Sequence, residues 1–111
     1  MEIVFSNSKL QKACNSQKEC IRKYGLENAR KIMQRLAELQ AAETLADIST
    51  LPPPRCHELT GEREGEFAVD VKQPHRIVFV PNHDPTPLNE EGGIDRNKVT
   101  KIRILEITDY H

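Results

Sequence analysis

Tryptophan is absent from this chain, and only five of its 111 residues are aromatic. A hydrophobic core must therefore be built mainly from isoleucine, leucine and valine. A chain of this length supports one core of modest size. We predict a single domain over residues 1–111.

Long apolar runs and targeting signals are also missing. No run approaches the roughly 20 apolar residues of a membrane-spanning helix, and residues 1–5 lack the basic start and apolar stretch of a signal peptide. The three cysteines, Cys14, Cys20 and Cys56, show no CxxC spacing, which favours reduced thiols over a disulfide framework. With 30% charged residues and a mean hydropathy of −0.62, the chain is predicted to be cytoplasmic. No resident metal or cofactor is predicted, because its imidazole and guanidinium groups suit chemistry without one.

The net charge of −1 conceals an uneven distribution. Residues 1–40 contain eight Lys/Arg and four acids, residues 41–70 contain two and seven, and residues 71–111 contain six of each. The basic third either faces phosphates or is an ordinary solvated helix surface. Its cations are the candidates for contact with the phosphates of a nucleic acid: Lys9, Lys12, Lys18, Arg22, Lys23, Arg30, Lys31 and Arg35.

Two amphipathic helices are predicted in the N-terminal half. After a short strand at residues 2–5, Ser6 or Asn7 can cap a helix that runs to Gly25, which suits a C-terminal stop. The second helix is indicated by apolar side chains at spacings of three and four residues: Leu26, Ala29, Ile32, Met33, Leu36 and Leu39. We expect an antiparallel helical hairpin with one apolar side, followed by a partial turn over residues 45–48.

The C-terminal half has the period of two that is typical of strands. Strands are predicted at 56–59, 67–71, 75–80 and 99–108, and residues 81–98 are a loop rich in proline, glycine and acids. The predicted fold class is α+β, with the N-terminal helical hairpin packed on one face of a twisted, mainly antiparallel sheet.

Three segments of the C-terminal half carry side chains that suit phosphodiester chemistry. The first runs from His57 to Val69 with the pattern His-x-Leu-x-Gly-x-Arg-x-Gly, the second is the Arg76-Ile-Val-Phe strand, and the third is Asp109-Tyr-His at residues 109–111. In this order they resemble the RelE/ParE superfamily of bacterial type II toxins, most closely its HigB branch. The resemblance covers nearly the whole chain and implies a ribosome-dependent mRNA endonuclease.

RNA carries its own nucleophile, so cleavage needs a base for the 2′-OH, an acid for the leaving 5′-oxygen and a cation for the phosphorane. Imidazoles and guanidinium groups fill these roles without a metal. We therefore predict His57 and His111 as the proton-transfer groups, with the base and acid unassigned. Arg76 would hold the scissile phosphate and Tyr110 would orient the nucleotide, while Asp109 would take part in proton transfer or fix an imidazole tautomer.

Arg63 is a candidate for a further phosphate contact. The neighbouring Glu62, Glu64 and Glu66 add negative charge there, which weakens intrinsic RNA affinity and fits an enzyme that positions its substrate on the ribosome. The loop over residues 81–98 is longer than in compact members of the family, and its role stays open.

Other interpretations of the same residues remain. Each histidine could be a surface residue, as expected for His75 and His83, and Arg76 could simply cover the sheet. A zinc site including Cys56 has suitable ligand types but no closed spacing. The rival functions are a non-catalytic, ParE-like toxin that binds DNA gyrase and a decayed toxin that only binds its antitoxin.

The resemblance also implies partners. These are a helix-turn-helix antitoxin, the ribosome and mRNA, with operator DNA contacted only through the antitoxin. The apolar helix stripe and the sheet edge are the surfaces expected to receive the antitoxin.

Overall fold

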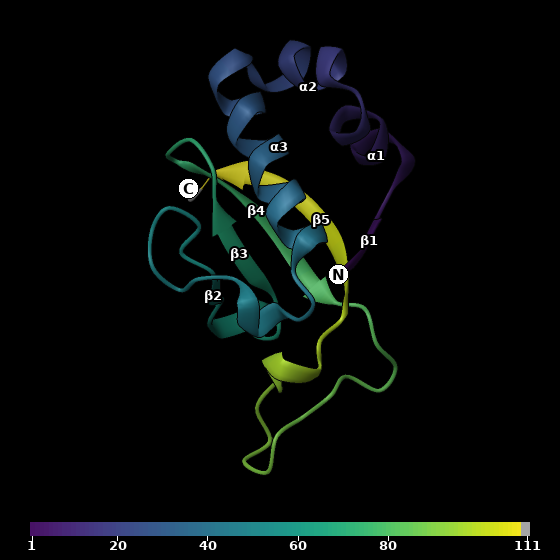
Figure 1. The fold of residues 1–111 in the computed structure, drawn as a ribbon, viewed down its shortest axis with the longest axis vertical. Coiled ribbons are helices and arrows are strands. Elements are labelled where there is room, and N and C mark those ends of the chain that lie inside the picture. The colour runs from purple at the N-terminus through teal and green to yellow at the C-terminus, as the bar shows by residue number, and fades with distance from the viewer. Residues whose placement is uncertain (110–111) are drawn as a thin grey trace.

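A computed structural model describes residues 1–109 of the chain, and its strands form one five-stranded sheet in the order β1-β5-β4-β3-β2 (Figure 1). The pairs from β2 to β5 are antiparallel, and β1 runs parallel to β5 at one edge. The α+β class and the mainly antiparallel sheet are confirmed. The strands are β1 (Glu2–Phe5), β2 (His57–Glu58), β3 (Phe67–Asp70), β4 (His75–Pro81) and β5 (Lys101–Asp109).

The first predicted helix is two helices, so the expectation of a simple hairpin was wrong here. It divides into α1 (Ser8–Asn15) and α2 (Gln17–Tyr24), because Ser16 adopts an extended conformation between them. The Ser16 hydroxyl accepts a hydrogen bond from the Glu19 amide at 3.2 Å and caps α2, as a serine at this position commonly does. Asn7 caps α1 in the same way.

The second predicted helix is confirmed as α3 (Leu26–Ala41), which crosses one face of the sheet (Figure 1). Alternate strand residues meet it and form the main core, in which the Phe67 and Phe79 rings stack with centroids 6.0 Å apart. This core has the branched aliphatic character that the composition predicted. Its fully buried members include Ile32, Leu39, Val69, Ile77, Ile102 and Ile104.

The sheet face opposite α3, called here the second face, carries a smaller apolar cluster. Leu59, Ala68 and Val78 are buried there, and Leu105 packs against them. Leu105 joins this cluster at an irregularity in the β4–β5 pairing, where Val78 lies opposite Glu106 but Phe79 lies opposite Ile104. Polar side chains share the second face with this cluster, as His57 and Glu106 do in the row of Ala68 and Val78.

The segment between β4 and β5 is more ordered than a plain loop. It contains the 3₁₀ turn η3 (Arg96–Lys98) and a bridge between Leu88 and Ile94. The Arg96 guanidinium lies 4.9 Å from the centre of the Phe67 ring, so η3 closes one end of the main core. A second 3₁₀ turn, η1 (Leu45–Asp47), fills the predicted partial turn beside it. Among residues 1–109, no helix is long and apolar enough to cross a membrane.

Candidate functional site

The strand register brings two of the predicted site residues to the second face. His57 on β2 lies in one row with Ala68, Val78 and Glu106, because these residues are direct partners across the sheet. Two residues further along the strands lies a row with Asp70, Arg76 and Thr108. Since strand neighbours are about 4.8 Å apart, the His57 and Arg76 side chains can reach one bound nucleotide from different strands.

The His57 ring is held in a defined orientation. Its Nδ1 lies 2.8 Å from the backbone carbonyl oxygen of Arg55. A carbonyl oxygen only accepts hydrogen bonds, so the proton of the neutral ring is on Nδ1 and Nε2 has the free lone pair. Nε2 is therefore the atom through which His57 can take up or deliver a proton.

Arg55 is in turn fixed by Asp70. Its φ of 46° is unusual for a residue with a side chain, and its guanidinium donates from Nε and Nη2 to the two Asp70 carboxylate oxygens at 2.7 and 3.0 Å. The Asp70 amide also donates to the Pro54 carbonyl at 2.7 Å. Asp70 thus supports the backbone that orients the His57 ring, although sequence reasoning did not single it out.

Arg35 was predicted as an RNA contact, but the structure buries it. Only 4% of Arg35 is exposed, and its Nε donates to the Asp70 carbonyl oxygen at 2.9 Å. Its Nη1 also pairs with Glu38. Arg35 therefore joins α3 to β3 and is removed from the surface cations.

Arg63 lies above the second face between two carboxylates. It donates from Nε to Glu66 at 2.8 Å and from Nη2 to Glu106 on β5 at 2.7 Å. The hydrogen bond to Glu106, and to a smaller extent that to Glu66, raises the pKa of Arg63. The guanidinium is therefore always charged. Glu66 and Glu106 were missed as site residues. Strand alternation placed Glu106 on a face, but no sequence signal paired it with Arg63, which is 43 residues away.

The third predicted segment is only partly described. β5 extends to Asp109, which pairs with His75, while Thr108 is the direct partner of Arg76. Strand alternation therefore directs Asp109 away from the face of Arg76. Tyr110 and His111 lie outside the described residues, and their roles stay predictions.

The surface cations of the N-terminal third are otherwise where the sequence placed them. Seven of the eight are exposed, on α1, α2 and α3: Lys9, Lys12, Lys18, Arg22, Lys23, Arg30 and Lys31. Arg22 forms an ion pair with Glu19. These helices therefore present positive charge to solvent.

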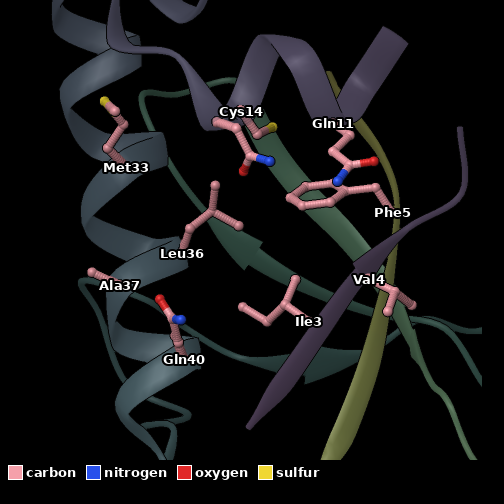
Figure 2. A pocket seen from close by; sticks show the side chains of 10 residues that line it. Ile3, Val4, Phe5, Gln11, Cys14, Met33, Leu36, Ala37 and Gln40 are labelled. Atoms are coloured by element: carbon pink, nitrogen blue, oxygen red, sulfur yellow. The ribbon is translucent and has the colours of Figure 1, made fainter. Parts of the chain in front are cut away.

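A hollow of about 520 Å³ lies between β1, α1 and α3 (Figure 2). Most of its lining side chains are apolar, but polar atoms, including the amides of Gln11, Asn15 and Gln40, supply about half of the accessible wall. Burial raises the pKa of its one thiol, Cys14, to about 11, which makes that thiol a poor nucleophile. The hollow suits the apolar side chains of a partner and has no catalytic set. The apolar lining residues are Ile3, Val4, Phe5, Met33, Leu36 and Ala37.

Residues 1–109 do not form the zinc site that was considered as an alternative. No group of three or more His, Cys, Asp or Glu side chains in that range is arranged to hold a metal ion. Cys56 is fully buried, and His83 Nε2 accepts a hydrogen bond from the Thr100 amide at 3.1 Å.

Comparisons with known proteins identify the fold. Neither the protein-family models nor the curated proteins match this chain. Among solved structures, a YoeB/ParE toxin from Agrobacterium tumefaciens matches with a TM-score of 0.58 and 11% identity over 100% of both chains. A YoeB-YefM complex and a YoeB dimer from Staphylococcus aureus match with TM-scores of 0.55 and identities of 14% and 16%, over 100% of this chain and 97% of theirs. The chain therefore has the fold of the RelE/ParE-type toxins, and at these identities the likeness establishes the fold alone.

Proposed function

We propose that this chain is the toxin of a type II toxin-antitoxin pair and cuts translated mRNA on the ribosome without a metal. The observation that carries the proposal is the His57 ring, whose Nδ1 is fixed by the Arg55 carbonyl on the sheet face that also presents Arg76. The likeness to solved YoeB/ParE toxins supports a toxin. The sequence resemblance favours the HigB branch.

In the proposed reaction, the base removes the proton of a 2′-OH, and the oxygen attacks the adjacent phosphorus. The bond to the 5′-oxygen breaks, that oxygen is protonated by the acid, and a 2′,3′-cyclic phosphate remains. His57 acts through Nε2 as one proton-transfer group and His111 as the other. Arg76 and Arg63 stabilise the charge on the phosphorane, and Tyr110 stacks on a base.

The proposed partners use other surfaces. The apolar hollow beside the edge strand β1 suits a segment of an antitoxin, which we propose is a helix-turn-helix protein that also links the pair to operator DNA. The solved YoeB-YefM complex, in which a protein of this fold has a protein partner, supports this assignment. The exposed cations of α1 to α3 supply contacts with RNA phosphates on the ribosome.

Primer extension on a translated mRNA, after brief induction of the chain, tests the proposal. We expect discrete cuts within translated message that disappear in the His111→Ala and His57→Ala variants, because each proton-transfer group contributes about 10²–10⁴-fold. A Leu51→Ala variant, which alters an exposed side chain, is the control and keeps the cuts.

The opposite results are equally clear. Cuts that persist in both histidine variants would reject the assigned catalytic groups. Absence of cuts from the folded wild-type chain would reject the nuclease, and DNA breaks would then identify a gyrase-binding toxin.

A further inference from the structure

The break between α1 and α2 forms a positively charged hollow of about 410 Å³. Four of the residues that line it are exposed cations: Lys9, Lys12, Arg22 and Lys23. The carboxylate in the same wall, Glu19, is engaged with Arg22 in an ion pair. Apolar atoms form most of its accessible wall, but the lining side chains have a net positive charge that attracts an anion of the phosphate type.

A continuous helix would not gather these cations. Lys9 and Lys23 would be about 21 Å apart along the axis of one straight helix, at 1.5 Å per residue. The extended conformation of Ser16 instead turns α2 back against α1, so that both lysines line the same cavity. The feature that the sequence did not reveal is thus the one that creates the hollow.

A second hollow, of about 220 Å³, lies beside the first and borders β5. Lys9 and Lys23 line it too, and its far wall is the Leu105–Ile107 segment of β5. That segment is accessible because the β1 register ends at Phe5 opposite Ile104. Glu106 in this wall is the residue that holds Arg63, so the path leads from the helix break to the second face.

We infer that the two adjacent hollows, which share Lys9 and Lys23, form a phosphate track for the RNA strand that is cut, with Lys9, Lys12, Arg22 and Lys23 as its contacts. The inference rests on the proposed function for the identity of the strand. A small anion needs one or two cations, whereas four cations around one hollow, two of which also line the next hollow, match the repeating charges of a single strand. The carboxylate of Glu106 is paired with Arg63, which also holds Glu66, so this end of the track supplies no cation and the phosphate contacts are those at the helix break.

The track separates the surface cations into two sets and so provides a matched control. Lys18, Arg30 and Lys31 are equally exposed but line neither hollow. They remain the candidates for ribosomal RNA, and variants at these positions remove the same charge from the same helical region.

The test measures binding of a fluorescein-labelled single-stranded RNA of about 12 nucleotides at increasing salt, in a His57→Ala background that leaves the RNA intact. Each phosphate contact on single-stranded RNA contributes about 0.7 to the slope of log affinity against log salt. We expect the Lys9→Gln/Lys23→Gln variant to lose about 1.4 from this slope. The control Lys18→Gln/Lys31→Gln variant keeps the slope of the parent.

Equal slopes in the two double variants would overturn the inference, since net charge alone would then govern binding. The inference would also be overturned if the Lys9→Gln/Lys23→Gln variant lost more affinity for poly-glutamate than for RNA. That result would assign the hollow to an acidic protein. The proposed function fails separately. If the slopes differ as expected but translated mRNA is never cut, the track stands and the nuclease is rejected, whereas cuts without a slope difference reject only the track.

Discussion

The two faces of the sheet are built from the same strands and differ in composition. Toward α3, alternate residues of β3, β4 and β5 are fully buried and apolar, as at Phe67, Ile77 and Ile104. On the second face, the intervening residues include His57, Arg76 and other polar groups that are half-buried. Because successive side chains of a strand point to opposite faces, one short sheet can have an apolar face and a more polar face.

The difference between the faces lies in what holds each side chain. Apolar residues toward α3 are held by close packing, which contributes through the area removed from water. On the second face, hydrogen bonds hold the polar groups, as that to Glu106 holds Arg63 and that to the Arg55 carbonyl holds the His57 ring. Substitutions on the two faces should therefore affect different properties of the protein.

The largest expected effect is on the second face. His57→Ala should lower the single-turnover rate of mRNA cleavage on ribosomes by about 10²–10⁴-fold, because it removes a proton-transfer group. Its free energy of unfolding should change by only about 1 kcal/mol, since one hydrogen bond to Arg55 is lost. Urea unfolding beside the kinetics checks both values. A variant that loses activity and stability together would contradict the separation of the faces.

On the α3 side, Phe79→Ala should lower the free energy of unfolding by about 3–5 kcal/mol, because it leaves a cavity beside the stacked Phe67 ring. The matched control is Leu51→Ala, at a side chain that is 69% exposed, which should change stability by less than about 0.5 kcal/mol. Urea titration measures both. A small effect of Phe79→Ala would show that the core is not closely packed at this ring.

A smaller effect is expected where the two faces are linked. Asp70→Asn should lower the free energy of unfolding by about 1.5–3 kcal/mol, because it replaces the charged acceptor of the hydrogen bonds from Arg55 with a neutral one. It should also alter the pH profile of cleavage, since Arg55 orients the His57 ring. A double-mutant cycle with Arg55→Gln measures the coupling. An unchanged pH profile would make Asp70 a purely structural residue.

The smallest expected effect comes from the buried thiols at alkaline pH. Burial raises the pKa of Cys56 from 9.0 to about 11, so the unfolded chain loses this proton at lower pH than the folded chain. The folded state then binds more protons, and the free energy of unfolding should fall as pH rises from 9 to 11. Denaturant unfolding across this range measures the slope. It should be shallower in Cys56→Ala, and an identical slope would exclude this thiol as a source.

Local sequence patterns were sufficient for most of the secondary structure. The spacing of apolar residues predicted α3, and the period of two predicted the antiparallel strands with His57 and Arg76 on them. The break at Ser16 was missed, because apolar spacing continues across it while a single serine hydroxyl supplies the cap. Such a cap is a local alternative to helix that periodicity does not detect.

The candidate site was only partly predictable. Residue types and order indicated His57, Arg63 and Arg76, but not the groups that hold them. The pairing of Arg63 with Glu106 joins residues 43 positions apart, and the support of Arg55 by Asp70 requires a register between strands. Burial of Arg35 depends in the same way on how α3 lies against β3.

The sequence by itself determined which residues alternate, which recur at helical spacing and which can donate or accept protons, because these properties belong to each residue and its near neighbours. The tertiary structure decided which of them share a face, which charges neutralise one another and where the helix break brings separated lysines to one hollow. Those outcomes depend on strand register and on packing between distant segments, since only there do groups far apart in the chain come within hydrogen-bonding distance.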